Sequence, residues 1–483
     1  MKRALLTLGF ALYLSLCAWA QTPGYKIDMH LKGLKDTTVY LGYYYGETTY
    51  VKDTAQVNHN GDFVFDGKEA LPQGVYMVVL GQSWIFQFVV SEKQRFSLTT
   101  DRADYVKNMV VKGDDDNQLF FDNLRYNQVK REESEPYIKI IKDSTKTEEE
   151  KKPAREAYAK ISDNVMAYQD GLIAKSPKSL TARLIQITKP IQVPDPPKRA
   201  DGTVDSTFQL RYYREHFFDY FDLADDALIR LPKPFYQEKV YEYLDKLFFQ
   251  TPDSIMAAID GIALKAKKNQ ETYKYIVWIC VYKYQRPTIM GLDEVYVRLY
   301  DKYYASGIMD FWINATLKKN LKEYADKLRP SLIGKTGANL VMQDEHLKPR
   351  SMYDLKTRYT ILYIFDPDCG HCREESPKLV SFYNKNKAKF NLEVYAVSAD
   401  TSMQKMKDYV KEMKMTWVTV NGPRSYVGPY SKLYYAETTP SLYVLDDKRK
   451  IIAKGVPAEK LEEFFTNYEK FLVRKTVPKS KGD

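Results

Sequence analysis

The sequence predicts a multidomain protein in which an N-terminal antiparallel β-sandwich is followed by an all-α middle region and a C-terminal α/β domain. Three observations support this order. Residues 25–112 alternate between apolar and polar side chains, which is typical of half-buried strands. Residues 114–330 place apolar side chains at helical spacing, and residues 331–475 alternate between strand-like and helical segments. We therefore expect domains at 21–113, 114–330 and 331–475, and a flexible basic tail at 476–483.

The first twenty residues are typical of a secretory signal peptide. Two basic residues, Lys2 and Arg3, precede an apolar stretch that is too short to span a bilayer comfortably. Residues 18–20 read AWA, which supplies the small residues of a cleavage site. We expect residues 1–20 to be removed and the mature chain to be exported.

Cys17 offers a second interpretation of this leader, because such a cysteine can become the lipid-modified N-terminus of an exported protein. Leu16, which precedes it, is larger than the residue expected at that position of a lipid-attachment signal. We therefore favour a cleaved signal peptide over a lipoprotein.

The charge of the chain is mildly basic, at +10 for 483 residues, and its Lys and Arg residues are interspersed with Asp and Glu. Loss of Lys2 and Arg3 with the leader lowers this charge to +8. Such a balance indicates a solvated mixed surface and argues against a nucleic-acid-binding protein. Beyond the leader, no stretch of the sequence is long and apolar enough to cross a bilayer.

The N-terminal region contains a series of short strand-like segments. In YKIDMHLKGL, the apolar residues Ile27, Met29 and Leu31 share one face of the expected strand. TVYLGYYYG, DFVFDG, VYMVVLG, IFQFVVS and RFSLTT follow, with the turn signals HNGD and PQG between them. This pattern indicates a small β-sandwich, in which His30 and His59 are expected to be solvated surface residues.

The middle region is helical in pattern. In SIMAAIDGIALKAKK, three isoleucines fall on one helical face, and Asp253 or Ser254 is available as the N-cap. A proline-rich stretch near 189–204 is expected to be an exposed loop between groups of helices.

The C-terminal region begins with the buried strand segment TILYIF and the helical segment CREESPKLVSFYNKN. The strand NLEVYAVS, the helix TSMQKMKDYVKEM and the strand TWVTV follow. SLYVLDDKRKIIAKG reads as a hairpin that turns at 446–448, and AEKLEEFFTNYEKFL as a closing helix. Strand–helix alternation followed by a hairpin predicts an α/β sheet with mixed strand directions.

The cysteines are too few for a disulfide scaffold. Of the four, Cys17 leaves with the leader, and Cys280 lies in the apolar run YKYIVWICVYKY, where it is expected to pack as a small hydrophobe. Cys369 and Cys372 remain as one close pair, which calls for an explanation by chemistry or by metal binding.

The pair lies at the junction between the strand TILYIF and the helix that follows. Unpaired N–H groups and the helix dipole at this end favour an anion, so the pKa of Cys369 should fall below the free-cysteine value of about 8.5. Protonated His371 would favour the thiolate further, whereas Asp366 and Asp368 would oppose it. Cys372 should lie on the same face of the first turn and be more buried.

This geometry predicts dithiol chemistry. Cys369 is the expected nucleophile, and Cys372 is the resolving thiol that attacks a mixed disulfide held on Cys369. The products are a reduced substrate and an intramolecular Cys369–Cys372 bond.

At these residues the C-terminal region resembles the thioredoxin-fold domain of the TlpA/ResA-like thiol–disulfide oxidoreductases, which are related to the AhpC/TSA proteins. The resemblance rests on Cys369-Gly370-His371-Cys372, on Pro377 and Glu375 in a C-x-x-C-x-x-E-x-P pattern, and on Thr439-Pro440 before the strand SLYVL. The stretch SLIGKTGANLVMQDEHL is similar to the family's lead-in strand, so the likeness covers about the last 145 residues.

The resemblance implies a site as well as a fold. It implies that Glu375 helps to move protons, and that Pro440 follows a cis peptide bond beside the thiols. It also implies that Thr439 presents its backbone to an extended substrate. Protein disulfides would be the substrates, a membrane-bound donor would supply electrons, and no cofactor beyond the Cys369–Cys372 disulfide would be needed.

The sequence departs from the family pattern in two places. Pro367-Asp368 stands where a Trp usually precedes the first cysteine, and Tyr363 stands where thioredoxin has a buried Asp. Proton handling is thereby left to Glu375 or to water. Because CGHC also occurs in oxidising and isomerising relatives, the direction of electron flow stays open.

The regions upstream resemble modules of exported Gram-negative proteins. A small β domain that precedes thioredoxin domains is similar to the segment from TVYLGYYYG to LPQGVYMVVL. A helical domain found between that β domain and the thioredoxin domain is similar to the segment from FFDYFDLADDALIRLP to MGLDEVYVRLYDKYYASGIMDFW. These resemblances imply a location in the periplasm or cell envelope. They assign no catalytic residue to either region.

Other functions are weighed against this one. Zinc binding needs about four ligands, which one CxxC with His346 or His371 does not provide, and haem attachment would need His in place of Arg373. A thiol peroxidase needs a Pro/Thr pocket just upstream of its cysteine, where only Pro367 is found. The main alternative is a non-catalytic envelope binding or scaffold protein, because some two-thirds of the chain lies outside the redox domain.

Overall fold

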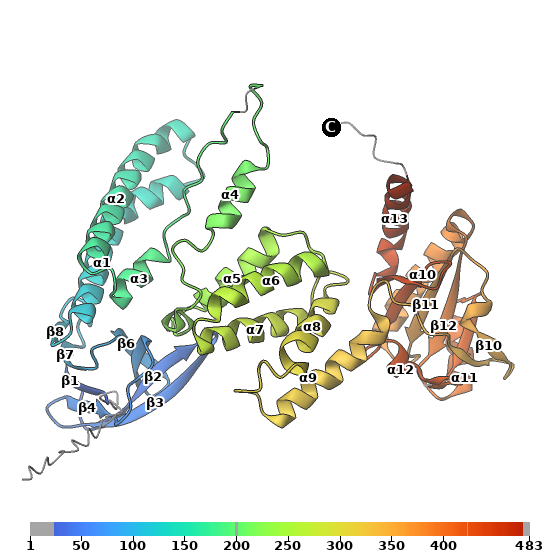
Figure 1. Cartoon of the computed structure of the whole chain (residues 1–483), viewed down its shortest axis with the longest axis horizontal. Helices are drawn as coiled ribbons and strands as arrows, with labels where there is room; N and C mark the ends of the chain where they lie inside the picture. The colour runs from blue at the N-terminus through green and yellow to red at the C-terminus, as the bar shows by residue number, and fades with distance from the viewer. Residues whose placement is uncertain (1–23, 199–200, 423, 477–483) are drawn as a thin grey trace, which may run out of the picture. The chain divides into compact units, whose positions relative to one another are not determined.

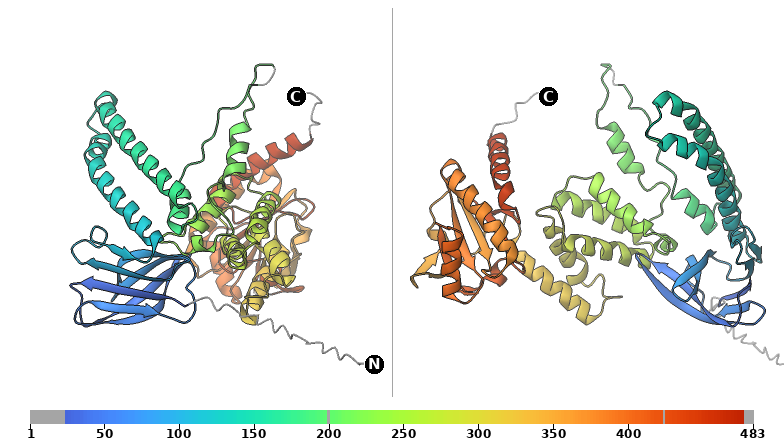
Figure 2. Two further views of the ribbon diagram at one scale, coloured as in Figure 1. Left: turned by 60° about the vertical axis from the view of Figure 1, so that its left-hand side comes forward. Right: turned by 180° about the vertical axis from the view of Figure 1, so that it is seen from behind.

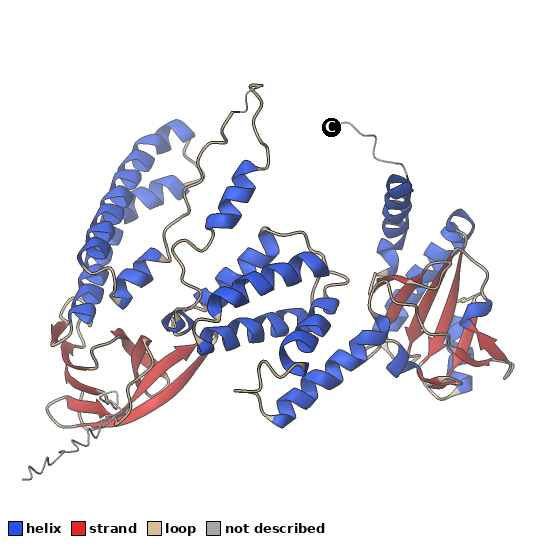
Figure 3. Cartoon of the chain, in the orientation of Figure 1, coloured by secondary structure: helices blue, strands red, loops and turns tan. Residues whose placement is uncertain are grey.

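The computed structural model describes residues 24–198, 201–422 and 424–476, whose elements are labelled in Figure 1 and coloured by type in Figure 3. The chain divides into two compact units, Met1–Tyr241 and Glu242–Asp483, each with a hydrophobic core of its own. The expected signal peptide, including Cys17, and residues 477–483 of the expected tail lie outside the described residues.

The first unit contains a β-sandwich of two four-stranded sheets. The side chains of both sheets share one core, which includes Ile27, Leu41 and Phe88. All neighbouring strands pair antiparallel except β1 and β7, which are parallel and far apart in the sequence. The antiparallel β-sandwich is thus confirmed, with one parallel pair. In sheet order the strands are β4 (Asp62–Asp66), β1 (Lys26–Lys32), β7 (Arg95–Asp101) and β8 (Val110–Lys112), and β3 (Thr48–Val57), β2 (Thr37–Tyr45), β5 (Gly74–Leu80) and β6 (Ser83–Val90).

The strand β3 has no counterpart among the segments expected from the sequence. Its first five residues are exposed, and only Ala55 and Val57 are buried, so it lacks the apolar alternation of its neighbours. The two histidines lie at the surface as expected, where His30 pairs with Asp62 at 2.7 Å and His59 pairs with Asp36 at 3.0 Å.

The first unit continues with a helical hairpin. The two long helices α1 (Asp115–Lys142) and α2 (Glu148–Lys175) lie side by side in Figure 2, and Tyr126 stacks on Tyr168 with ring centroids 3.9 Å apart. Shorter elements follow, and the described part of the proline-rich segment between α3 and α4 is a loop, as expected. These elements are α3 (Leu180–Gln186), α4 (Phe208–His216), the 3₁₀ turn η1 (Asp226–Ile229) and α5 (Phe235–Lys246), within which the two units divide.

The second unit begins with helices. They are α6 (Pro252–Ala266), α7 (Gln270–Gln285), α8 (Asp293–Leu299), the π-helical η2 (Tyr300–Ala305), α9 (Ala315–Leu328) and the 3₁₀ turn η3 (Arg329–Ser331). The three isoleucines of α6 are buried together as predicted. The predicted N-cap of this helix is wrong: Thr251 is the cap and accepts from the Ser254 N–H, because Pro252 occupies the first helical position, which suits a residue without an N–H. Cys280 is fully buried in α7, as expected of a packed small hydrophobe.

The remainder of the second unit is a seven-stranded mixed sheet with helices packed against it. Its central strands β11, β12 and β13 are parallel, and the strands outside them are antiparallel to their neighbours. In sheet order the strands are β10 (Pro349–Ser351), β9 (Val341–Asp344), β13 (Val418–Asn421), β12 (Leu392–Ser398), β11 (Tyr359–Phe365), β16 (Ser441–Leu445) and β17 (Ile451–Lys454). The helices are α10 (Gly370–Phe390), α11 (Met403–Glu412), α12 (Tyr430–Leu433) and α13 (Leu461–Thr476); η4 (Met352–Asp354), η5 (Ala458–Lys460) and the small hairpin β14 (Arg424–Ser425) and β15 (Gly428–Pro429) complete it.

The strand β11 lies at the centre of this domain. All seven of its residues are buried, and alternate side chains face two different cores. Tyr363 and Phe365 pack on one side with α10, α11 and α13, and Leu362 and Ile364 pack on the other. This is the predicted α/β domain with a thioredoxin fold. Within the described ranges, none of the helices combines the length and the apolar character needed to cross a membrane.

Candidate active site

The first thiol of the pair lies at the start of a helix. After β11 the chain turns through Asp366, whose carbonyl oxygen accepts from the Cys369 N–H at 3.1 Å. Cys369 is the N-cap of α10, with extended backbone angles (φ −83°, ψ 121°), so its sulfur lies beside the unpaired N–H groups of the first helical turn. The position predicted from the strand–helix junction is therefore the one observed.

The pKa of Cys369 lies below its ordinary value. Burial acts to raise it, but hydrogen bonds to the thiolate from the Thr439 side chain and from the backbone and side chain of Cys372 lower it more. The backbone N–H of His371 contributes in the same direction. The helix terminus thus has the predicted effect, and the sulfur remains partly exposed.

The second thiol has the opposite character. Cys372 is fully buried in the first turn of α10, and burial raises its pKa to about 12. The Asp366 N–H donates to its Sγ at 3.4 Å and opposes this increase, whereas Cys369 adds to it. The two sulfurs are therefore distinguished as an ionisable, accessible group and a protonated, inaccessible one.

A third element reaches the site from a distant part of the chain. The Cys369 thiol donates to the carbonyl oxygen of Thr439 at 3.3 Å, and the Thr439–Pro440 peptide bond is cis. These two residues precede β16, which pairs antiparallel with β11. The resemblance implied this arrangement, and the structure brings the residues together.

The acidic residue just before the thiols, Asp368, has a basic partner that sequence analysis did not identify. Lys405 of α11 lies 2.5 Å from an Asp368 carboxylate oxygen and 3.1 Å from one of Asp400. Its ammonium group offsets the negative charge next to Cys369. His371 points into solvent with 86% of its side chain exposed, and its ring lies 3.9 Å from Glu374.

Among the described residues, Asp366 joins Asp368 and Asp400 in a group of carboxylates whose oxygens could approach a metal ion. One oxygen each from Asp366, Asp368 and Asp400 lies within 4.8 Å of the others. Because Lys405 already pairs with two of these carboxylates, the positive charge at this place is supplied by the protein itself.

A chain of hydroxyl groups lies beneath the helix in the buried core. The Tyr363 hydroxyl lies 2.8 Å from Ser376 Oγ, which in turn lies 2.9 Å from the Tyr409 hydroxyl. Cys372 belongs to the same buried cluster as the two tyrosines. Sequence analysis noted Tyr363 as a replacement for an acidic residue but did not identify Ser376 or Tyr409, since their meeting depends on packing of α10 and α11 on β11.

The remaining predicted residues of α10 occupy distinct places. Glu375 is half-buried, and its carboxylate accepts from the Ala458 N–H and lies 3.5 Å from the Lys378 ammonium group. Pro377 lies within the helix, where it lacks the N–H that would donate to the Arg373 carbonyl. A proton-transfer role for Glu375 stays a prediction.

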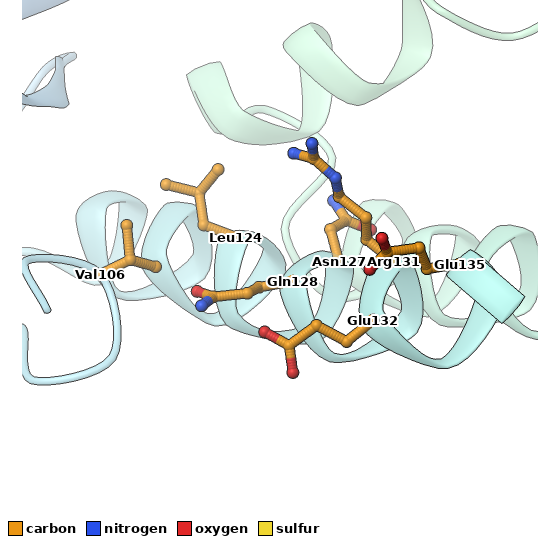
Figure 4. Close-up of a pocket in the computed structure, with 7 residues that line it drawn as sticks. All are labelled: Val106, Leu124, Asn127, Gln128, Arg131, Glu132 and Glu135. Carbon is orange, nitrogen blue, oxygen red and sulfur yellow. The ribbon is translucent and has the colours of Figure 1, made fainter.

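A hollow on the first unit has a different character. It measures about 540 Å³ and lies mostly along α1, as Figure 4 shows. Its side chains include neither cysteine nor histidine, so they offer no nucleophile of the kind found in α10. They are Val106, Leu124, Asn127, Gln128, Arg131, Glu132 and Glu135.

The comparisons with known proteins agree with this geometry. Residues 333–454, which contain both thiols and the Thr439–Pro440 pair, match the AhpC/TSA family. Residues 333–454 thus form a domain of the AhpC/TSA family. Residues 25–120 match a domain of unknown function, DUF4369, and residues 137–327 match another, DUF5106. Among curated proteins, no match to the chain was found.

Several solved structures are similar to parts of the chain. A domain of a possible thiol–disulfide isomerase from Cytophaga hutchinsonii is 36% identical over 30% of this chain and 97% of that one, with a TM-score of 0.28. A thioredoxin-like protein from Bacteroides caccae is 17% identical over 58% and 100% of the two chains, with a TM-score of 0.45. The thioredoxin domain of a thiol–disulfide oxidoreductase from Bacteroides vulgatus is 26% identical over 29% and 96%, with a TM-score of 0.26.

Proposed function

We propose that this protein is a thiol–disulfide oxidoreductase that reduces protein disulfides through Cys369 and Cys372. The observation that carries the proposal is the contrast between the two sulfurs. Cys369 is partly exposed with a lowered pKa, and Cys372 is buried with a pKa of about 12. Dithiol chemistry needs this contrast, because one sulfur must attack the substrate first. The other sulfur must react only after the mixed disulfide has formed.

In the first step, the Cys369 thiolate attacks one sulfur of a substrate disulfide. The substrate S–S bond breaks, a mixed disulfide forms on Cys369, and the other substrate sulfur leaves as a thiolate that takes up a proton. The Thr439 carbonyl oxygen lies 3.3 Å from the Cys369 sulfur, so the backbone at this place can pair with an extended substrate segment.

In the second step, Cys372 loses its proton and attacks the Cys369 sulfur, which releases the second substrate thiol. The protein is left with a Cys369–Cys372 disulfide, having given up two electrons and two protons. We assign the removal of the Cys372 proton to Glu375, three residues along the same helix. Each new cycle requires a dithiol donor, for which we propose a membrane-bound partner.

The place of this reaction is proposed from the leader sequence. A cleaved signal peptide at 1–20 would deliver the chain to the periplasm or cell envelope, where protein disulfides are found. We propose no metal and no cofactor beyond the redox-active disulfide, and no nucleic-acid partner.

Reduction of insulin by the purified chain tests the proposal. The wild type should reduce insulin in the presence of a dithiol donor, and Cys369→Ser should abolish this activity. Cys372→Ala should accumulate mixed disulfides with its substrates, which mass spectrometry can identify. An inactive wild type with free thiols would instead favour the scaffold function, and rapid consumption of peroxide without insulin reduction would favour a peroxidase.

A further inference from the structure

A groove of about 490 Å³ lies within the second unit, beside the predicted active site. One wall is the segment 285–293, which joins α7 to α8, and the other is the segment 437–443, which contains the cis proline. Thr438 and Pro440 line the groove, and Thr439 between them contacts the Cys369 sulfur. The groove therefore adjoins the loop that contacts the reactive sulfur, although neither Cys369 nor Thr439 lines it.

The groove is held by specific contacts between its walls. The Tyr324 hydroxyl donates to the Gln285 carbonyl oxygen at 2.8 Å and lies 3.1 Å from the Tyr435 hydroxyl. The Lys454 ammonium group, three-quarters or more buried, pairs with Asp293, and the Lys454 N–H donates to Met290 Sδ at 3.3 Å. These contacts join the helices of the second unit to its thioredoxin-fold domain at both ends of the groove.

Most of the charges in the groove are already paired. Lys454 pairs with Asp293, and the Glu437 carboxylate binds Lys327 at 2.6 Å and the Tyr435 hydroxyl at 3.2 Å. Arg286, in contrast, is exposed and forms no salt bridge with any residue that the structure describes, although its charge, after the hydrogen bonds from Lys327 and Tyr435, helps to lower the pKa of Glu437. It thus adds an exposed positive charge to a groove whose carboxylates already pair with Lys327 and Lys454.

The same wall presents apolar surface to solvent. Ile289 and Met290 each have 43% of their surface exposed, next to Arg286 in the sequence. An exposed apolar pair beside an exposed cation suits a segment that carries an apolar and an acidic side chain. A volume of this size accepts a few side chains, which fits a stretch of extended polypeptide.

We propose that this groove binds the polypeptide segment that flanks the reactive cysteine of the substrate, and that Arg286 and Ile289 select segments with acidic and apolar side chains. The loop between α7 and α8 thereby determines specificity for the redox domain. This inference rests on the proposed function and names the substrate class of the same site.

Two short peptides test the charge preference. Each contains one cysteine in mixed disulfide with thionitrobenzoate and a neighbouring leucine, and they differ only in a flanking Glu or Lys. Reduction by the Cys369–Cys372 dithiol releases the peptide thiol and the coloured thionitrobenzoate, and it leaves the protein disulfide. At low salt, we expect wild-type kcat/KM to be about fivefold higher for the Glu peptide, as one surface ion pair allows.

Arg286→Glu should reverse this preference, and Arg286→Gln should bring the ratio of the two peptides close to one. Arg474→Glu, which makes the same charge change at an exposed position of α13, is the control and should keep the wild-type ratio. The preference should also weaken at high salt, because the pair is exposed.

The apolar contact is tested separately. Ile289→Ser should lower kcat/KM for the Leu–Glu peptide about threefold relative to a Ser–Glu peptide, as loss of part of one buried side chain predicts. Ile308→Ser changes an isoleucine of nearly equal exposure, 44%, outside the groove, and should not alter that ratio.

Reduction of cystine by the wild type separates the two proposals. If cystine is reduced but the wild type does not distinguish the peptides, or Arg286→Glu keeps the preference for Glu, the groove proposal is overturned and the proposed function stands. If the wild type reduces neither cystine nor the peptides, both are overturned.

Discussion

The Sγ atom of Cys369 lies 3.3 Å from the carbonyl oxygen of Thr439, although 70 positions separate the two residues in the sequence. Strand register explains this contact. β11 and β16 pair antiparallel with Ile364 opposite Ser441, so the end of one strand lies beside the start of the other. The chain leaving β11 and the chain entering β16 therefore meet at one edge of the sheet, and the reactive sulfur is placed there.

Selective alkylation should follow from the contrast between the thiols. In the reduced native protein at pH 7, iodoacetamide should label Cys369 and leave Cys372 and Cys280 unmodified, because burial raises the pKa of both to about 12. The labelling rate should increase with pH and reach its midpoint at a lower pH than that of an ordinary cysteine, because the pKa of Cys369 is lowered. Mass spectrometry of peptides from the labelled protein measures this, with urea-unfolded protein as the control in which all three thiols react.

Lys405 should control part of that reactivity. Lys405→Met leaves the carboxylates of Asp368 and Asp400 without their ion pairs, and a negative charge next to Cys369 disfavours its thiolate. We expect the pKa of Cys369 to rise and its alkylation at pH 7 to slow about threefold. Lys411→Met, an exposed change on the same helix, is the matched control. An unchanged alkylation rate in Lys405→Met would show that this ion pair has no bearing on the thiolate.

The buried hydroxyl chain should contribute to stability. Ser376→Ala removes the partner of both the Tyr363 and the Tyr409 hydroxyls and leaves two polar groups in an apolar core. We expect the free energy of unfolding to fall by about 1–3 kcal/mol, as is usual for unsatisfied buried groups. Urea unfolding followed by fluorescence measures the change.

A triple variant provides the control for this prediction. Adding Tyr363→Phe and Tyr409→Phe to Ser376→Ala removes the unsatisfied hydroxyls themselves, so much of the lost stability should return. If the triple variant is less stable than Ser376→Ala alone, the loss comes from packing and not from unpaired hydroxyl groups.

Sequence reasoning identified what depends on local pattern. The buried strand β11, the helix that starts at the thiols, and the positions of Cys369 and Cys372 follow from residues close together in the chain. β3 does not follow from local pattern, because most of its residues face solvent and carry no apolar alternation. The N-cap of α6 is Thr251, two or more residues before the predicted cap, because Pro252 occupies the first helical position.

What sequence reasoning could not identify depends on tertiary packing. Lys405, Ser376 and Tyr409 are common residue types on helices, and nothing in their neighbourhood along the chain marks them. They become part of the site because α10 and α11 pack together on β11, which brings their side chains to Asp368 and Tyr363. The groove beside Arg286 arises in the same way, from segments about 150 residues apart.

Glu375 should act on the second step of the reaction. Cys372 stays protonated at neutral pH because burial raises its pKa to about 12, so its attack requires a base. Glu375→Gln keeps an oxygen that can accept from the Ala458 N–H but cannot take a proton, and it should slow resolution of the mixed disulfide about a hundredfold. Formation of the mixed disulfide by Cys369 should not slow comparably. Stopped-flow mixing with a peptide–thionitrobenzoate disulfide separates the two steps.

The matched control for this variant is Glu374→Gln. Glu374 is the neighbouring carboxylate, is 75% exposed, and lies 3.9 Å from the exposed ring of His371. Its replacement should leave the resolution step unchanged, so a general effect of charge on α10 can be told apart from proton transfer. If Glu374→Gln slows resolution as much as Glu375→Gln does, the effect comes from charge on α10 and not from proton transfer by Glu375.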